Sequence, residues 1–527
     1  MNSIGFTNFR KFAKFPELQF GDITIMVGGN NAGKSTLVKA MLLMRDFLKS
    51  RIETKSDNSI FKSFIPQFNF DSEHVNVGDF YRSFCRQAPV NEDTITFVMR
   101  VDKFDFTVNV QGERKPGIIP QVSFLSIGYD KKSVIFDFDF VKNQMVARFA
   151  VGKEKQIKTG EEGKIQDRFT MLNTLNERLS MSNDLAEISD LKLQIENLEK
   201  EIEAQKRAVK PIVTPVEDMV TVDMSFFMGD NVGKLILPEL VKGFVHYAWV
   251  GTLGDKSSQK YKAQEGKKNF LKSKAEIINK ISAELETVLS SEVVEYIYSH
   301  SVAQTPCYSN ATSSNDYATR TIHEFYRSRI SSGDEEFSII EDGLSLFGLG
   351  KSLQVESVLG LGDSYRVLVF DDENPEGMDL ADKGMGSIQI ILLLLRLATL
   401  AKKYKGTNHV VLLEEPEQNL HPALQSKLAD LLYYVNKDYG IRFVVETHSE
   451  YLVRKSQVIV AEENFSDEAA MTANNKFKVF YLPNDGEKPY EMQYARSGRF
   501  RNKFGEGFFD EAGKSNLITL KKEKSLQ

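Results

Sequence analysis

The strongest chemical signal in the sequence is a glycine-rich stretch near the N-terminus. Residues 28–36 read Gly-Gly-Asn-Asn-Ala-Gly-Lys-Ser-Thr and fit the pattern G-x-x-x-x-G-K-[ST]. Glycines let a backbone wrap closely around phosphates, and N–H groups at a helix start supply partial positive charge. We therefore expect Lys34 to reach the β- and γ-phosphates of a nucleotide and the Ser35 hydroxyl to bind Mg²⁺. The candidate nucleotide-binding residues here are Gly28, Asn30, Asn31, Ala32, Gly33, Lys34, Ser35 and Thr36.

Two later stretches place polar side chains directly after apolar runs. Residues 409–417 read His-Val-Val-Leu-Leu-Glu-Glu-Pro-Glu, and residues 443–449 read Phe-Val-Val-Glu-Thr-His-Ser. Both patterns indicate buried strands, and α/β sheets bind ligands at the carboxyl ends of such strands. We expect Glu414 to hold Mg²⁺, directly or through water, and Glu415 to polarise the attacking water. His448 is expected to contact the γ-phosphate.

A second glycine-rich turn precedes the most apolar helix of the sequence. Residues 382–389 read Asp-Lys-Gly-Met-Gly-Ser-Ile-Gln and lead into the apolar helix predicted for residues 390–400. Glycine and serine at a helix start form an anion-binding geometry. Gly384, Gly386 and Ser387 are therefore candidate phosphate contacts, although a plain helix-entry turn has the same pattern.

The elements that position these residues indicate an α/β fold. One helix, from Lys34 to about Leu48, follows the first glycine-rich turn, and from Asp382 onward helices alternate with strands as in a parallel α/β unit. The first 150 residues otherwise read as strands. The strands predicted there are Ile4–Phe12, Asp22–Val27, Thr94–Val101, Phe104–Val110 and Val134–Phe140.

A charged segment between these parts has heptad spacing. The apolar residues Ile188, Leu191, Ile195, Leu198 and Ile202 step by three and four positions, and residues 172, 175 and 179 do the same. With a turn at residues 180–184, this predicts an antiparallel coiled-coil hairpin; the alternative is one amphipathic helix on a globular core. The domains expected are an N-terminal lobe (1–155), the coiled-coil insertion (156–212), a mixed middle region (213–375) and a C-terminal lobe (376–527).

Composition narrows the class of protein. The 527 residues contain 67 Lys and Arg against 73 Asp and Glu, a net charge of −6, which argues against nucleic-acid binding over the whole surface. Cys85 and Cys307 form no CxxC pair, so a disulfide framework or a cysteine-ligated zinc site is not expected. No signal peptide is expected, because residues 1–12 contain no apolar core of the required length. No membrane span is expected, because the most apolar run, Ile388–Ala401, is too short. We therefore expect a cytoplasmic location with no membrane contact. Nucleic acid could bind at the lysine-rich stretch Lys256–Lys274, although a solvated surface has the same pattern.

In their order along the chain, these motifs resemble those of the ATPase class that includes ABC transporters, SMC proteins and OLD-type defence ATPases. Two sequences are similar to those of the OLD-like "AAA family ATPase" subgroup: residues 414–422, Glu-Glu-Pro-Glu-Gln-Asn-Leu-His-Pro, and residues 446–452. The tail 507–511 resembles a short module of that subgroup. The resemblance covers residues 1–50 and 376–512, and it implies an ABC/SMC-type P-loop ATPase head with mixed sheets and the inserted hairpin.

The resemblance implies ATP and Mg²⁺ as ligands and a head-to-tail homodimer or higher homo-oligomer. Residues 28–36, Glu414, Glu415 and His448 would act on one ATP, and Gly384, Gly386 and Ser387 of the other subunit would cap its γ-phosphate. Asn419 and His421 would lie in the loop that couples the two sites, and Asn8 and Arg10 match a position that often contacts nucleotide. The turn 384–389 departs from the family's Ser-Gly-Gly-Gln. Gln67 and residues 76–79 are candidates for the lid loop.

The resemblance also suggests a biological role. OLD nucleases continue into a Toprim domain, but only 79 residues follow His448 here, and they contain no Asp-x-Asp. Standalone members of the subgroup pair with a separate effector, a nuclease or toxin, as in the Septu and PARIS anti-phage systems. The expectation is therefore an ATPase that senses infection and regulates such an effector. The alternatives are an SMC- or Rad50-like DNA-binding ATPase in repair, a transporter subunit, and a scaffold that hydrolyses ATP slowly.

Overall fold

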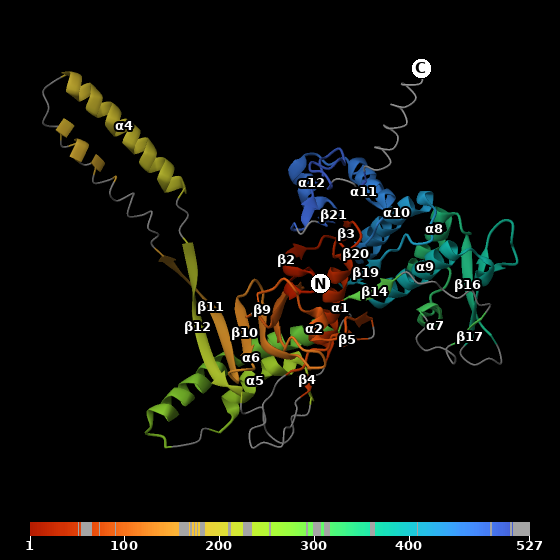
Figure 1. Cartoon of the computed structure of the whole chain (residues 1–527), viewed down its shortest axis with the longest axis horizontal. Coiled ribbons are helices and arrows are strands. Elements are labelled where there is room, and N and C mark those ends of the chain that lie inside the picture. Colours follow the sequence, from red (N-terminus) through yellow and green to blue (C-terminus); the bar gives the residue numbers. More distant parts are fainter. Residues whose placement is uncertain are drawn as a thin grey trace.

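The computed structural model shows two large sheets and their helices, from which one long hairpin projects (Figure 1). The structure describes residues 1–50, 52–53, 66–72, 74–89, 91–157, 168, 171–172, 174–176, 178–179, 185–208, 212–224, 234–251, 255–290, 294–298, 307–309, 317–358, 364–407, 409–484, 487–505 and 508–509. The predicted turn at 180–184 and most of the tail 507–511 lie outside these ranges.

A mostly parallel sheet forms the centre of the molecule. Its strand order is β14-β19-β20-β3-β21-β22, and only β22 runs antiparallel to its neighbour. All six residues of β3 are buried, as expected for a strand covered on both faces. The strands are β3 (Ile23–Gly28), β14 (Glu295–Tyr298), β19 (Val410–Glu414), β20 (Arg442–Glu446), β21 (Phe477–Leu482) and β22 (Tyr490–Met492). The α/β fold class is therefore confirmed, and the acidic strand ends lie at one edge of this sheet.

An antiparallel sheet of eight strands packs over one side of the parallel sheet. Along β7, β8 and β10 buried residues alternate with half-buried ones, so one face of the sheet is apolar. Asp137 and Asp139 lie on the other face, as expected from the alternation. In sheet order the strands are β12 (Ile212–Asp223), β11 (Gln144–Ile157), β10 (Val134–Asp139), β9 (Gln121–Tyr129), β8 (Phe104–Gln111), β7 (Thr94–Val101), β1 (Ser3–Phe9) and β2 (Phe12–Gln19).

The predicted strand Ile4–Phe12 is wrong, because the chain reverses within it. β1 ends at Phe9 and β2 begins at Phe12, so Arg10 and Lys11 form the turn of a hairpin. Arg10 has a positive φ of 54°, which a continuous strand does not allow. This turn carries both cations toward the phosphate loop.

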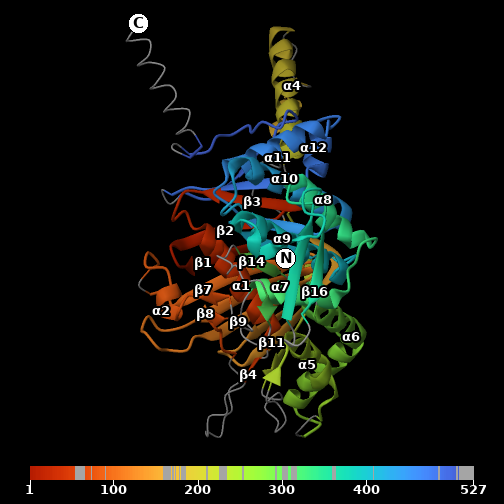
Figure 2. The same cartoon turned by 90° about the vertical axis from the view of Figure 1, so that its right-hand side faces the viewer.

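Helix α1 (Lys34–Lys49) lies between the two sheets, and twelve of its sixteen residues are buried. One apolar core lies between the parallel sheet, α1 and the antiparallel sheet, and a second core lies on the other face of the parallel sheet. Figure 2 shows this layering from the side. The other helices are α2 (Phe80–Ser83), α4 (Leu185–Ala208), α5 (Leu237–Trp249), α6 (Gln259–Ser290), α7 (Tyr317–Ser328), α8 (Ser338–Phe347), α9 (Met385–Lys403), α10 (Pro422–Tyr439), α11 (Glu450–Glu462) and α12 (Glu468–Asn474), with 3-10 turns at Glu335–Phe337 and Leu380–Asp382.

Smaller strand groups complete the fold. In one group β15 (Tyr308–Ser309), β16 (Ser352–Ser357) and β18 (Met378–Asp379) pair with β17 (Ser364–Phe370). In two others, β4 (Ile52–Glu53) pairs with β13 (Lys234–Leu235), and β5 (Asp71–Ser72) pairs with β6 (Val75–Asn76).

The projecting hairpin begins as a ribbon of two strands. β11 and β12 stay paired as far as Ile157 and Ile212, and α4 forms the returning arm beyond them (Figure 1). The described residues of the outgoing arm, between 168 and 179, are helical. The structure therefore agrees with two helical arms where it describes them.

The two arms show burial at two of the predicted heptad positions and one ion pair between them. Leu175 on the outgoing arm and Leu191 on α4 are both buried. Arg168 forms an ion pair with Glu201 at 3.2 Å, which joins the two arms. The described residues therefore form two arms joined by an ion pair, and a coiled coil over the whole insertion stays a prediction.

Helix α9 is longer than its apolar run suggested. With 19 residues and a mean hydropathy of 1.6, it is the one helix in the described ranges that is long and apolar enough to cross a membrane. The expectation that this segment is too short was wrong, because the helix extends beyond Ile388–Ala401 at both ends. However, 72% of its apolar window is buried in the fold, and Arg396 in its middle pairs with Glu295 and Glu324. These contacts are those of a core helix.

Candidate functional site

The phosphate loop runs from the end of β3 to the start of α1 and depends on glycine at two points. Gly33 has a φ of 106°, and a Cβ there would overlap the ring of Phe12. A Cβ on Gly28 would lie 2.5 Å from the carbonyl oxygen of Leu482. The Lys34 ammonium donates to the carbonyl oxygens of Gly28 (2.9 Å) and Gly29 (3.2 Å). In this structure the Lys34 ammonium is therefore hydrogen-bonded to carbonyl oxygens of its own loop, and a bound phosphate would compete with them for the ammonium.

Replacement of Gly33 by alanine tests this geometry. The added methyl group would meet the Phe12 ring. The alanine would also have to keep the left-handed backbone of residue 33, which destabilises the folded protein by about 1 kcal/mol or more. We expect the Gly33→Ala protein to melt at a lower temperature and to lose ATP binding in calorimetry. Gly406, which also has a positive φ but no neighbour within 4 Å of an added Cβ, provides the control. Unchanged ATP affinity of Gly33→Ala would contradict the assignment.

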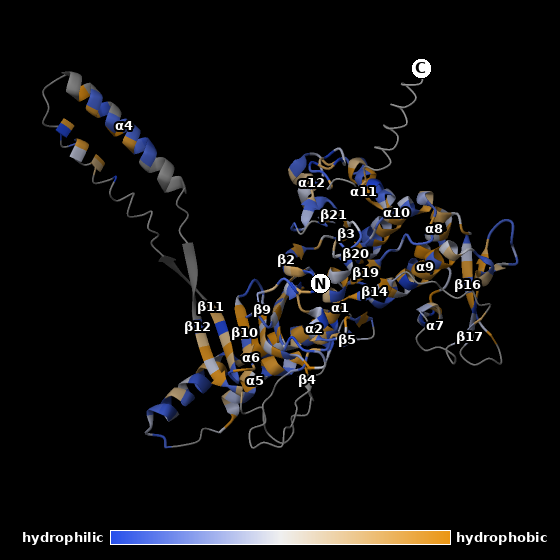
Figure 3. Ribbon diagram, in the orientation of Figure 1, coloured by the Kyte–Doolittle hydropathy of each residue, from blue (hydrophilic) through white to orange (hydrophobic). Residues whose placement is uncertain are grey.

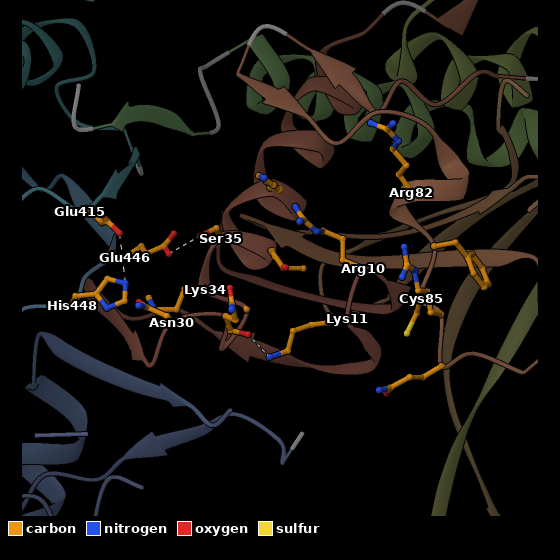
Figure 4. Close-up of a pocket in the computed structure, with 17 residues that line it drawn as sticks. Arg10, Lys11, Asn30, Lys34, Ser35, Arg82, Cys85, Glu415, Glu446 and His448 are labelled. Carbon is orange, nitrogen blue, oxygen red and sulfur yellow. Dashed lines mark hydrogen bonds and ion pairs between the residues drawn. The ribbon is translucent and has the colours of Figure 1, made fainter. Parts of the chain in front are cut away.

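A cavity of about 950 Å³ opens over the phosphate loop (Figure 4). It brings together Lys34, Ser35, Glu415 and His448, which the sequence predicted to act on one nucleotide. Of the other predicted residues, Asn30, Asn31, Gly33, Thr36 and Arg10 also line it. The remaining lining residues are Lys11, Lys39, Arg82, Phe84, Cys85, Arg86, Gln87 and Glu446.

Glu446, at the end of β20, is the carboxylate next to the phosphate loop. It accepts a hydrogen bond of 2.9 Å from the Ser35 hydroxyl. Burial, together with the nearby charge of Glu414, raises the pKa of Glu446 to about 7. Its second oxygen, Oε2, is buried with no hydrogen-bond partner among the described residues. A divalent cation beside Ser35 would satisfy that oxygen, so these groups fit Mg²⁺.

The sequence analysis did not select Glu446. The available signal was an acidic residue at the end of an apolar run, directly before Thr447. Its significance depends on the strand order, because β20 lies between β19 and β3. Glu414, on β19, is one strand further away, and it accepts a hydrogen bond from the Tyr296 hydroxyl instead. Magnesium binding by Glu414 stays a prediction.

Glu415 and His448 face each other at the cavity (Figure 4). Their Oε1 and Nε2 atoms are 3.6 Å apart, and both side chains are more than a third exposed. The backbone of Glu415 has a φ of 46°, and its N–H donates to the carbonyl oxygen of Glu446 at 2.8 Å. Burial and the charge of Lys34 lower the pKa of His448, so its ring is neutral at pH 7. Such a ring can donate one hydrogen bond to a phosphate oxygen.

The Glu417 side chain is hydrogen-bonded to the backbone of His448. Its carboxylate accepts a hydrogen bond of 2.7 Å from the His448 backbone N–H. The side chain is buried, and this burial raises its pKa. The backbone at His448 is therefore fixed by the acidic stretch that also carries Glu415.

Cations form the opposite wall of the cavity. Lys11 donates to the carbonyl oxygen of Asn31 at 2.6 Å, which ties the hairpin turn to the phosphate loop. Burial and the charge of Arg10 lower the pKa of Lys39. This mutual repulsion is relieved by an anion, as a triphosphate would supply. Asn8, by contrast, is buried and donates to Glu92 and to the carbonyl oxygen of Thr94, away from the cavity.

The second glycine-rich turn lies elsewhere. Gly384 caps α9, and a Cβ on Gly386 would lie 2.6 Å from the carbonyl oxygen of Asn419. The turn thus packs on the loop that follows Glu415, and neither Gly384, Gly386 nor Ser387 lines the cavity. Their contact with nucleotide stays a prediction. In the same loop region His421 caps α10 by accepting from the Ala423 N–H at 3.3 Å.

The candidates for the lid loop line a different cavity. Gln67, Gly78 and Asp79 lie around a space of about 620 Å³. The glutamine that lines the cavity above the phosphate loop is Gln87. This position follows α2 and had no distinguishing pattern in the sequence.

Comparison with known proteins gives a family and a distant structural likeness. The model of a family described as "AAA ATPase domain" matches residues 1–453, whereas no curated protein matches. The chain is similar to the Smc head domain with an extended coiled coil from Pyrococcus furiosus, solved bound to the C-terminal domain of ScpA: 12% identity, 93% and 96% of the two chains, TM-score 0.29. It is also similar to the SMC head domain from Thermotoga maritima: 10% identity, 93% and 98% of the two chains, TM-score 0.31. Because the family match spans most of the chain and includes the phosphate loop and both acidic strand ends, the chain belongs to the AAA ATPase domain family.

Proposed function

We propose that this protein binds ATP with Mg²⁺ and hydrolyses it at the cavity above the phosphate loop. The observation that carries the proposal is the meeting of Lys34, Ser35, Glu415, Glu446 and His448 at one cavity, from three separate segments of the chain. Lys34 and the loop N–H groups hold the β- and γ-phosphates. Ser35 and Glu446 would hold Mg²⁺, which neutralises phosphate charge when bound.

The residues at the mouth of the cavity suit hydrolysis. Glu415 is exposed enough to contact water and is placed to accept its proton as the water attacks the γ-phosphate. Neutral His448, whose Nε2 lies 3.6 Å from Glu415, has one N–H to donate and would give it to a γ-phosphate oxygen when ATP is bound. Hydrolysis at this site is tested by the Glu415 substitution described in the Discussion.

We further propose that two heads associate head-to-tail around ATP. The turn with Gly384, Gly386 and Ser387 is an anion-binding helix start that lies outside its own subunit's cavity. A second subunit could present this turn to the γ-phosphate. This arrangement is what the sequence resemblance implied.

Light scattering on the Glu415→Gln protein tests the association. One chain has a mass of 59.8 kDa, and with ATP and Mg²⁺ we expect a mass of at least twice this value. The same protein carrying Ser387→Arg, which places bulk and charge at the turn, should stay at its nucleotide-free mass. Identical masses for the two proteins with ATP would contradict a contact through this turn.

At the level of biology, we propose that the ATPase regulates a separate effector, a nuclease or toxin, in anti-phage defence. Support comes from the sequence resemblance and from the projecting hairpin, which offers a surface distant from the ATP site (Figure 1). A phage-challenge assay on cells with the native locus tests the role. Protection should require both the neighbouring gene and Glu415; protection that survives deletion of the neighbouring gene would exclude this role.

A further inference from the structure

The free end of the α5–α6 helix pair carries an exposed aromatic ring. Trp249, the last residue of α5, is 69% exposed, although tryptophan is among the most buried residues on average. It is the single tryptophan of the protein. The Lys272 ammonium lies 5.0 Å from the centroid of its ring, and the other parts of the ring are accessible.

Exposed lysines without ion-pair partners in the described chain continue from this ring along the first turns of α6. Residues 255–274 contain seven lysines and two carboxylates, in a chain of net charge −6. The structure exposes five of these lysines, and within the described ranges none of the five has an ion-pair partner. One of the two carboxylates, Asp255, is engaged in its own turn, where it accepts from the Ser257 N–H at 2.9 Å. The five lysines are Lys256, Lys260, Lys262, Lys267 and Lys272.

The helix geometry presents these side chains to solvent. α6 has 32 residues and α5 only 13. The buried Lys268 donates to the carbonyl oxygen of Val250, just past the end of α5, so the first turns of α6 extend beyond α5. Figure 3 shows this end of α6 as a hydrophilic projection, and Figures 1 and 2 place it well below α4. The start of a helix adds partial positive charge.

A ligand for this surface must combine negative charge with flat, stackable groups. Single-stranded nucleic acid has both, since phosphates bind lysines and unpaired bases stack on aromatic rings. The bases of a duplex are already stacked on one another, so they have no free face on which the Trp249 ring could stack. An anionic membrane would need a larger apolar surface, because the other large apolar side chains exposed on this helix pair, within the described ranges, are Val250 at 37% and Ile277 at 40%.

We propose that the tip of the α5–α6 pair, defined as Trp249 with the five lysines, binds single-stranded nucleic acid, with one base stacked on Trp249. This function goes beyond the proposed ATPase and does not require hydrolysis. It is therefore measured on nucleotide-free protein.

Tryptophan fluorescence gives a direct test, because the only tryptophan lies at the proposed site. A thymidine 20-mer titrated into the full-length protein at low salt should quench the emission to a plateau. Anisotropy of a labelled 20-mer should show binding roughly tenfold weaker for Trp249→Ala, the scale of one lost stack. Lys256→Glu/Lys260→Glu should also weaken binding, and should lower the slope of log K against log salt by about 0.7 for each lost phosphate contact.

A matched control separates the site from general charge. Lys131→Glu/Lys132→Glu changes the net charge by the same amount in an exposed turn between β9 and β10, and should bind like the parent. Circular dichroism melting confirms that each variant is folded. Equal weakening by both lysine pairs, or unchanged binding by Trp249→Ala, would overturn the proposal. A fluorescence change with phosphatidylserine vesicles but none with the 20-mer would also overturn it and indicate a membrane site.

Discussion

Replacement of Glu415 by glutamine is expected to leave ATP binding intact and to slow hydrolysis by at least about 100-fold, the scale of losing a general base. Glutamine has the shape of glutamate, but it cannot take the proton of the attacking water. Glu415 is suited to this role because its side chain is partly exposed at the cavity and faces His448 at 3.6 Å. The left-handed backbone at Glu415, held by a hydrogen bond to Glu446, directs the side chain there.

The measurement is single-turnover ATP hydrolysis together with ATP affinity from calorimetry. Glu450→Gln is a suitable control. Glu450 is the first residue of α11, two positions after His448, and it forms an ion pair with Arg454. The control should hydrolyse ATP at the parental rate. Equal turnover of the Glu415→Gln protein and the parent would refute the assignment of the base, even if ATP still binds.

Replacement of Glu446 by glutamine has the second largest expected effect, and it acts through Mg²⁺. Glu446 accepts the Ser35 hydroxyl, and its other oxygen is buried without a partner in the described chain. Glutamine can still accept from Ser35 and fill the space, so we expect the fold to persist. The loss of one negative charge should lower the apparent affinity of the ATP-bound protein for Mg²⁺ by about 10- to 100-fold, as for other groups that orient a metal.

Comparison of Glu446→Gln with Glu414→Gln shows which of the two carboxylates binds Mg²⁺. Glu414→Gln removes the same charge from the neighbouring strand end, where the side chain contacts Tyr296. Titration of Mg²⁺ into protein with bound fluorescent ATP, followed without turnover, should show the larger loss for Glu446→Gln. A larger loss for Glu414→Gln would instead support the prediction made from the sequence. ATP binding in EDTA should be no weaker in either variant than in the parent.

Much of the site was predictable because it is local. The phosphate loop depends on residues 28–36, whose glycines and lysine act within one turn between a strand and a helix. The ends of β19 and β20 were predictable because each apolar run stops at a polar residue. The cavity accordingly unites Lys34, Ser35, Glu415 and His448. The heptads of the hairpin were likewise visible in the spacing of the apolar residues.

The errors arose where the chain turns or ends in ways that spacing does not reveal. The hairpin at Arg10 was read as one strand, because a residue with positive φ leaves no mark in an alternating pattern. Helix α9 was judged by its apolar run, although it continues through Met385 and Lys403. Neither error affected the sheet edge at which the ligand is expected to bind.

By itself, the sequence determined the chemistry: a phosphate loop, acidic strand ends and a histidine, each readable because its residues are neighbours in the chain. The tertiary structure alone decided which groups meet. Strand order brings Glu446, and not Glu414, to Ser35. The hairpin turn brings Arg10 and Lys11 to the phosphate loop, and the packing of α6 on α5 leaves Trp249 exposed beside Lys272. Such contacts join residues tens to hundreds of positions apart, and only the packing of the sheets and helices sets them.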